Sequence, residues 1–505
     1  MPKTIGTVIS TIEGPSTYEF NFVIKEDSGQ IPVHKGQFIQ LQTEEGILVG
    51  RVDEIIKTNR YFMQAESVRE YEKSGKPLMD MFPVDRWEYL VGKAASLGIY
   101  DNKTLKRVTF PPSPGSNVEE IDSNILFDFL GLDAKGLNIG KIAFHDLDAK
   151  INLTKLFHKH LAILAISGAG KSHLVSVFLE ELLERSNEMG KPAIIVIDPH
   201  GEYAGFAEDN NYSKRTKVFN KESPLSISAS SLSPYQIMEF LPQISHVQRR
   251  ELMKIIQDLK RKRKHYGFKE LIKAIEDSDI KKVTKETMIS WISNLNITCL
   301  FSNINYPSVT DLAKPGQLSI MDLSDFLRLN EKQIIVTYFA RKLFYARHQQ
   351  KIPPFILIVE EAHQFCPEGV ERQGAISKGI IETIAREGRK FHASLVLISQ
   401  RPIQLSTTAL SQCNSQILLR ILNPYDLKHI SESNEALTSD LIKTLPGLQV
   451  GEAVITGNAV NHPLFVQIRP RKSKESSRLG VNFEDAILSY KNKINKNEKD
   501  LDTFM

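Results

Sequence analysis

The sequence predicts an α/β protein with a largely parallel sheet, an inserted helical subdomain and a small N-terminal β-barrel. Three observations carry this prediction. Short runs with alternating apolar residues fill the first part of the chain, short continuous apolar runs follow from residue 161, and a stretch of helical periodicity interrupts them. A chain of 505 residues is long enough for two or three domains with separate cores.

The first part of the chain has the pattern of short antiparallel strands. The runs that alternate apolar and polar positions are residues 18–24, 38–41 and 47–52. They predict a small antiparallel barrel within residues 1–110. The sequence PPSPGS at 111–116 is typical of a linker, because proline fixes φ and removes a donor, and we assign residues 111–151 to a linker and connecting strands.

From residue 161 the pattern changes to apolar strand, loop and amphipathic helix. The continuous apolar runs are residues 161–166, 193–197, 318–321, 355–359 and 394–398. Strands buried on both faces of a parallel sheet have this composition. We therefore assign residues 152–470 to an α/β domain, residues 224–314 to a helical insertion within it, and residues 471–505 to a charged C-terminal arm.

The composition, with 41% hydrophobic and 25% charged residues, is that of a soluble globular protein. No apolar run is long enough to span a bilayer and the N-terminus has no signal-peptide pattern, so we expect a cytoplasmic protein without a membrane partner. The three cysteines form no CxxC motif, which argues against a disulfide framework or a zinc site. A net charge of +4 permits a nucleic-acid partner without arguing for one.

The most specific motif is AISGAGKS at residues 165–172, which follows an apolar strand and opens an amphipathic helix. It departs from GxxxxGK[ST] only in its first residue, alanine. Gly168 and Gly170 allow successive backbone N–H groups to surround phosphates at the helix N-terminus. Lys171 is expected to reach the β- and γ-phosphates, and the Ser172 hydroxyl to ligate Mg²⁺. The predicted ATP and Mg²⁺ site comprises Ser167, Gly168, Ala169, Gly170, Lys171, Ser172 and His173.

A second motif ends another apolar strand with two carboxylates. Glu360 is expected to hold Mg²⁺ partly through water, and Glu361 to polarise the attacking water. Glutamate stands at the first of these positions, where aspartate is more common. A solvated helix start after a core strand has the same sequence, but a P-loop in the same sheet favours the catalytic interpretation. The two motifs together predict a RecA-like P-loop ATPase core.

Two further segments end strands near the same edge of the predicted sheet, and a third closes a helix. Asp198 and Glu202, in DPHGEY, are candidates to touch the metal-bound water or couple nucleotide to a loop, and Gln400, in SQRP, is a candidate γ-phosphate sensor. Plain turns are the alternatives. Arg386 and Arg389 close a helix, where cations often only complement the dipole. In a ring-forming ATPase such an arginine can stabilise transition-state charge, worth about 10³ or more in rate.

Together these segments resemble the HerA family, whose relatives include the FtsK-type DNA pumps. The matching segments, in the family's order, are HLAILAISGAGKS (160–172), DPHGEY (198–203), IVEEAH (358–363), IAREGRK (384–390), ISQRP (398–402) and GEAVI (451–455). The resemblance covers the ATPase core from about residue 152 to about residue 468. By pattern and position, the N-terminal strands resemble the family's HAS-barrel.

The resemblance implies a hexameric ring around double-stranded DNA, with ATP bound at subunit interfaces. It also implies ATP-dependent translocation along DNA, or unwinding of DNA, as the activity. Arg389, with Arg386 as the second choice, matches the family's arginine that completes a neighbour's site. Lys159 stands where the family usually has arginine. Lysine keeps the positive charge but lacks the planar guanidinium group that can bind a phosphate through two hydrogen bonds. His462 and Pro463 match positions beside the nucleotide.

The resemblance also implies a partner. Archaeal members of the family work with the nuclease NurA in processing DNA ends, and bacterial members pair with other effectors in defence against phage. This chain contains no recognisable nuclease signature. Any cutting of DNA is therefore expected from a nuclease partner.

Two basic segments are candidates to contact DNA. Lys260, Arg261 and Lys262 belong to the densest basic run, on a predicted helix of the insertion. Solvated charge is the default interpretation, and phosphate contact with counterion release is the alternative. Arg372 lies in PEGVERQ at 367–373, where a ring motor would have a pore loop.

Two other functions fit the sequence. One is a nucleotide-gated scaffold that assembles a partner complex without processive translocation, although the intact Lys171 and Glu361 favour turnover. The other is a coupling ATPase at a membrane channel, against which the absence of a membrane segment counts. Stimulation of ATP hydrolysis by duplex DNA distinguishes a translocase from a scaffold.

Overall fold

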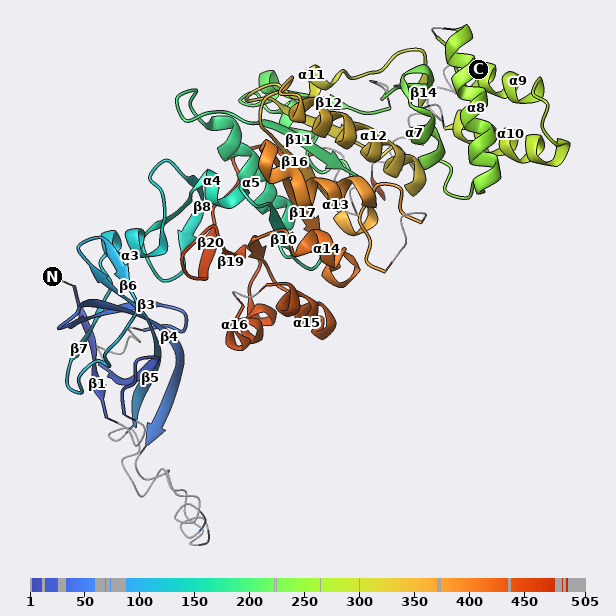
Figure 1. The fold of residues 1–505 in the computed structure, drawn as a ribbon. Helices are drawn as coiled ribbons and strands as arrows, with labels where there is room; N and C mark the ends of the chain where they lie inside the picture. The colour runs from blue at the N-terminus through green and yellow to red at the C-terminus, as the bar shows by residue number, and fades with distance from the viewer. Residues whose placement is uncertain are drawn as a thin grey trace. The chain divides into compact units, whose positions relative to one another are not determined.

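The structure is a computed structural model of the 505-residue chain. It describes residues 2–10, 14–25, 33–59, 69, 73, 88–221, 223, 225–263, 265–298, 300–369, 374–434, 437–476, 484 and 487–488. They form two compact units (Figure 1). The first holds the described residues of Met1–Asn152, Ala436–Thr444 and Glu452–Arg469, and the second holds those of Leu153–Glu435, Leu445–Gly451 and Pro470–Met505.

The first unit begins with a closed antiparallel barrel. Its strands, in the order in which they pair, are β2 (Glu19–Ile24), β1 (Thr4–Ile9), β7 (Asn117–Glu120), β3 (Phe38–Thr43), β4 (Gly46–Asn59) and β5 (Glu88–Asp101). Pairing of β2 with β5 closes the barrel, and β6 (Thr104–Lys106) extends β5. Closure leaves the barrel strands without a free edge. The predicted N-terminal β-barrel is confirmed.

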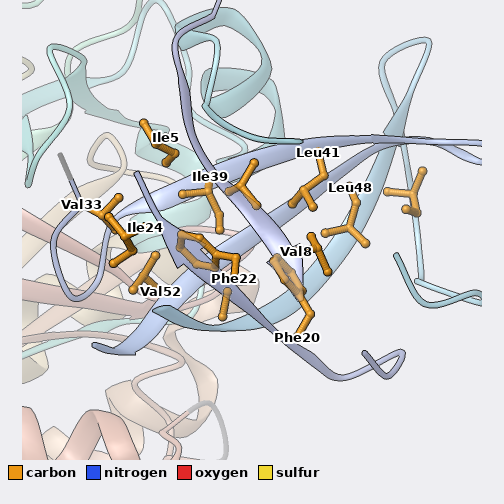
Figure 2. Close-up of a cluster of buried hydrophobic side chains, with 13 residues drawn as sticks. Ile5, Val8, Phe20, Phe22, Ile24, Val33, Ile39, Leu41, Leu48 and Val52 are labelled. Carbon is orange, nitrogen blue, oxygen red and sulfur yellow. The ribbon is translucent and has the colours of Figure 1, made fainter. Parts of the chain in front are cut away.

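The alternation of apolar residues gives the barrel its core. Along β2 every second side chain, at Phe20, Phe22 and Ile24, is buried. Figure 2 shows these side chains inside the barrel together with those of Ile5 and Leu48. The period of two in the sequence therefore places one face of each strand in the interior.

The first unit also contains helices and a second set of strands. Helix α3 (Ser123–Leu130) and the short α16 (Ser439–Thr444) belong to it. Its other strands pair antiparallel in the order β19 (Glu452–Gly457), β20 (Leu464–Ile468), β8 (Leu137–Ile142) and β9 (Asp148–Ile151). From the sequence we placed residues 452–468 in the α/β domain. In the structure β20 pairs with β8, some 300 residues earlier in the chain, a contact that local periodicity does not reveal.

The second unit is built on parallel strands. Their order is β12 (Thr216–Phe219), β15 (Leu318–Asp322), β11 (Ala193–Asp198), β16 (Phe355–Val359), β17 (Ala393–Ser399), β10 (Leu161–Leu164) and β18 (Ser415–Leu418). Each neighbouring pair in this order is parallel. Every residue of β10, β11, β15 and β16 is buried, as expected for strands covered on both faces. The predicted parallel α/β core is confirmed.

Helices connect these strands (Figure 1). The longer ones are α5 (Lys171–Glu184), α12 (Leu329–His348), α13 (Lys378–Glu387) and α15 (Pro424–Ser433). Short helices are α4 (Leu153–Phe157), α6 (Gly205–Glu208), α11 (Val309–Leu312) and α14 (Thr407–Leu410). Among the described residues, none of the helices has the length and hydropathy to cross a bilayer.

The helical insertion predicted from the sequence is confirmed. It contains α7 (Pro234–Glu239), α8 (His246–Lys262), α9 (Phe268–Glu276) and α10 (Lys282–Ile297), and Figure 1 shows the last three packed as a group. The strands β13 (Ile227–Ser228) and β14 (Phe301–Ser302) pair where it begins and ends. Ser245 is the N-cap residue of α8, and its side chain accepts from Gln248 N in a capping box.

Candidate functional site

The parallel order of the strands brings four loops of the second unit to one edge of the sheet. The strands β11, β16, β17 and β10 are consecutive neighbours, and their carboxyl ends point the same way. The loops that follow carry the segments 165–170, 198–203, 360–363 and 399–402. Ligands of open α/β sheets bind at this edge. The separate sequence motifs therefore meet in one place.

The P-loop has the backbone that its glycines predict. Gly168 and Gly170 have φ values of 77° and 95°, in the left-handed region that other residues rarely adopt. Helix α5 begins immediately afterwards at Lys171, so its free N–H groups and positive dipole end lie at the loop. Such a helix start is a binding site for phosphate.

Lys171 lies between the two carboxylates that end β16. Its Nζ is 2.9 Å from Glu360 Oε2 and 2.9 Å from Glu361 Oε1, and all three side chains are buried. Burial acts to lower the pKa of Lys171, but the attraction of the two carboxylates is larger in sum and raises it. Burial raises the pKa of Glu360, and Lys171 and the Tyr203 hydroxyl oppose that rise. The sequence-predicted lysine and carboxylates thus form one cluster.

The segment 198–203, here called the acidic loop, adds two contacts to the cluster. Glu202 accepts a hydrogen bond from the Ser172 hydroxyl, and the Tyr203 hydroxyl donates to Glu360. Of the two candidates that the sequence left open in this loop, Glu202 is therefore the one that contacts the P-loop. Tyr203 was not predicted, because nothing in DPHGEY shows that its side chain crosses to the neighbouring strand.

Asp198 organises the acidic loop from within. Its carboxylate accepts hydrogen bonds from the backbone N–H groups of His200 (3.2 Å), Gly201 (2.8 Å) and Tyr203 (3.0 Å). Burial raises the pKa of Asp198 to about 7, against the opposing effect of the backbone donors, and the negative charge of Glu360 adds to the rise. This carboxyl group therefore titrates near neutral pH.

Besides Lys171, two residues contact the carboxylate of Glu361. Gln400 Nε2 donates to Glu361 Oε1 over 2.6 Å, and His363 Nδ1 lies 3.3 Å from Glu361 Oε2. His363 Nδ1 is also 3.1 Å from Ser399 Oγ, and burial lowers its pKa. Gln400 was a predicted site residue, whereas His363 was missed although it lies in the quoted segment IVEEAH. Only the φ of 47° at Glu361, which turns the chain sharply, brings it back to this carboxylate.

The predicted arginines lie elsewhere in the second unit. Arg386 and Arg389 are exposed at and just after the end of α13. Arg389 Nε donates to His158 Nε2 over 3.0 Å, which places it beside the segment that contains Lys159. Lys159 is half-buried. These cations therefore lie on the surface, whereas the Lys171 cluster is buried.

The remaining predicted residues come from other segments of the chain. His462 and Pro463 belong to the first unit, where the His462 ring stacks on Phe129 at 4.7 Å, whereas the P-loop belongs to the second unit. Lys260, Arg261 and Lys262 are exposed at the end of α8, and Lys260 Nζ donates to Leu232 O over 2.6 Å. Arg372 lies outside the described residues.

The oxygen atoms near the P-loop suit a metal ion that binds together with a nucleotide. Within the described ranges, no group of three or more His, Cys, Asp or Glu side chains is arranged to hold a metal ion by itself. Mg²⁺ at nucleotide sites takes ligands from phosphates and water besides one or two protein groups. The hydroxyl of Ser172 and the carboxylates of Glu202 and Glu360 are suitable protein groups of this kind.

Comparisons with known proteins find similarity to HerA helicases. A family model described as the central domain of helicase HerA matches residues 137–343. A probable helicase of Methanocaldococcus jannaschii is 28% identical over 459 residues, 86% of each chain. The DNA double-strand break repair helicase HerA of Pyrococcus furiosus is 26% identical over 519 residues, 90% of each chain. The protein with the same description from Saccharolobus solfataricus is 27% identical over 487 residues, 91% of this chain and 92% of the relative.

Among solved structures, VirB4 of Thermoanaerobacter pseudethanolicus is similar with a TM-score of 0.55. The match covers 67% of this chain and 98% of that chain, at 15% sequence identity. At such an identity the likeness shows a common fold and carries no function with it.

Proposed function

The chain belongs to the HerA helicase family and is a P-loop ATPase, and we propose that it hydrolyses ATP to move along or unwind double-stranded DNA. The observation that carries the proposal is the cluster in which Lys171 lies 2.9 Å from both Glu360 and Glu361 at the start of α5. The names of its relatives, among them DNA double-strand break repair helicases, supply the substrate.

In the proposed reaction the P-loop binds the phosphates of ATP. Backbone N–H groups of residues 167–173 donate to phosphate oxygens, and Lys171 exchanges its carboxylate partners for the β- and γ-phosphates. Ser172 exchanges Glu202 for the metal ion. Mg²⁺, when bound, neutralises charge that develops on the phosphates.

Glu361 is the proposed general base. It lies at the end of β16, where Gln400 and His363 fix both of its oxygens. A carboxylate held in this way can orient a water molecule and accept its proton during attack on the γ-phosphorus. Gln400 is in turn placed to respond to loss of the γ-phosphate, because it bonds to the same carboxylate.

Arg389 is the proposed residue that acts on a neighbouring subunit's ATP. It is exposed, as a residue that reaches another subunit must be, and Lys159 lies beside its hydrogen-bond partner His158 in the chain. The family resemblance adds a hexameric ring with ATP between subunits and a nuclease of the NurA type, or another effector, as partner. Lys260, Arg261, Lys262 and Arg372 remain proposed DNA contacts, and His462 and Pro463 remain proposed nucleotide contacts.

ATP-dependent displacement of a third strand from a linear duplex tests the proposal. A motor that moves along DNA strips a triplex-forming strand without needing to unwind the duplex. We expect displacement that requires ATP and is lost in Lys171→Ala, while Lys443→Ala, at an exposed lysine far from the P-loop in sequence, behaves as wild type. Hydrolysis of ATP without displacement under any condition would leave a nucleotide-gated scaffold as the function.

A further inference from the structure

The segment that follows the last strand packs onto the P-loop helix. Residues 471–476, here called the C-terminal strap, are anchored by Glu180, which is fully buried in the middle of α5. One oxygen of Glu180 accepts from Lys472 N (2.8 Å), Ser473 N (2.8 Å) and Ser473 Oγ (2.7 Å). Burying a carboxylate costs free energy, and the three hydrogen bonds from the strap offset that cost. Because such charge-assisted hydrogen bonds are strong, they hold the strap on α5.

The far end of the C-terminal strap reaches the acidic loop. Ser476 Oγ donates to the carbonyl oxygen of Gly201 over 2.7 Å. Between the two ends, Lys474 N donates to Asp209 Oδ2 over 3.0 Å. The strap backbone also lies against Gly205, where an added Cβ would be 2.5 Å from Lys474 O. The strap therefore contacts the residues on both sides of Glu202 and Tyr203.

These contacts link the strap to the groups that meet at the P-loop. Glu202 bonds to Ser172 and Tyr203 bonds to Glu360, so the position of the acidic loop sets the position of both groups. We propose that the C-terminal strap, through Glu180 and Ser476, positions the acidic loop for the Mg²⁺-dependent step of ATP hydrolysis, an inference that rests on the ATPase function proposed above. Glu180 and Ser476 are then positioning residues, because neither touches the reacting atoms.

The first test removes the hydroxyl of Ser476. In Ser476→Ala we expect kcat for ATP to fall about 2- to 10-fold, the effect of one hydrogen bond, with KM for ATP changed less than about 2-fold. The Mg²⁺ concentration for half-maximal rate is expected to rise. Ser278→Ala is the matched control, because that hydroxyl also donates to a backbone carbonyl, Ile275 O, but within the helical insertion.

The second test displaces the strap without altering it. Gly205→Ala places a methyl group against the strap backbone, and we expect the same kinetic changes as in Ser476→Ala. Gly447→Ala is the matched control, because a Cβ there would meet no atom within 4 Å. Neither glycine has the positive φ that would strain alanine by itself.

Hydrogen–deuterium exchange of the peptide covering residues 198–203 reports the position of the loop without relying on activity. Faster exchange in Ser476→Ala and Gly205→Ala, with both controls unchanged, is the expected result. Wild-type kcat, Mg²⁺ dependence and loop exchange in both variants overturn the inference and leave the ATPase function intact. A wild-type protein that hydrolyses no ATP overturns both.

Discussion

Lys171 and Ser172 each have a carboxylate partner in the structure. Lys171 contacts Glu360 and Glu361, and Ser172 contacts Glu202. A nucleotide that binds here replaces these partners with phosphate oxygens and a metal ion. Because breaking a buried ion pair by removing one partner costs about 3–5 kcal/mol, an exchange that keeps Lys171 paired throughout avoids most of this cost. The carboxylates freed in the exchange are those that we propose act on water and metal.

Asp198 makes the stability of the second unit depend on pH. Its pKa is about 7 in the folded protein and near 4 in an unfolded chain, so the folded state binds the extra proton between these values. The stability that this group contributes is present below about pH 4 and is lost as the pH rises through 7. Asp198→Asn removes the titrating group. We therefore expect the difference in Tm, wild type minus variant, to decrease by about 5 °C when the pH is raised from 5 to 7.

Differential scanning calorimetry of both proteins over this pH range measures the effect. The absolute Tm of Asp198→Asn is not the readout, because asparagine offers one acceptor oxygen fewer to the loop's N–H groups. Only the change of the difference with pH reports the titration. A Tm difference that stays constant from pH 5 to pH 7 contradicts the raised pKa.

Sequence motifs predicted several residues of the buried cluster, and missed two others that contact its carboxylates. Lys171, Glu361 and Gln400 follow from their places in the P-loop and at two strand ends, and the structure brings them together. Tyr203 and His363 could not be predicted to join them. Each contact depends on how a loop turns after its strand, which the strand pattern does not determine.

The barrel depends on a close approach between two of its strands. Gly92 on β5 lies opposite Phe22 on β2, and a Cβ at Gly92 would be 2.5 Å from the Phe22 ring. We expect Gly92→Ala to destabilise the barrel by about 1–3 kcal/mol through overpacking. Phe22→Leu shortens the facing side chain, so the double variant should recover part of that loss.

Urea unfolding of the two single variants and the double variant measures this coupling as a double-mutant cycle. An interaction energy of about 0.5 kcal/mol or more, with the double variant more stable than the sum of the single effects, is expected. Strictly additive losses would mean that the barrel does not bring these two positions together.

The order of the parallel strands in the second unit was largely predictable, whereas two of those strands and the barrel closure were not. The five apolar runs beginning at residues 161, 193, 318, 355 and 394 are β10, β11, β15, β16 and β17. The strands β12 and β18 were missed, because TKVF and SQIL are four residues long and half polar. Pairing of β2 with β5 joins residues about 70 apart, and sequence alternation does not identify partners.

At the scale of the whole assembly, Arg389 is proposed to complete a neighbour's site. In that arrangement Arg389→Ala and Lys171→Ala damage different sites, so each variant alone loses activity. Randomly mixed subunits regain it wherever an intact Lys171 meets a neighbour's intact Arg389, at about one quarter of the interfaces in an equal mixture. Steady-state ATPase rates across mixing ratios measure the recovery.

The control is a mixture of Arg389→Ala with the double variant Arg389→Ala/Lys171→Ala, in which no interface has both residues. It should stay inactive at every ratio. Should the first mixture also stay inactive at every ratio, Arg389 acts within its own subunit or serves the fold.

The most direct test of the central claim is steady-state ATP hydrolysis with and without linear duplex DNA, for wild type and for Glu361→Gln. We predict that DNA accelerates hydrolysis by the wild type. Glu361→Gln should still bind ATP, but its rate of hydrolysis should be lower by a factor of about 100 or more, with or without DNA, because the proposed base is gone. Hydrolysis that DNA does not change, or that survives in Glu361→Gln, contradicts the account.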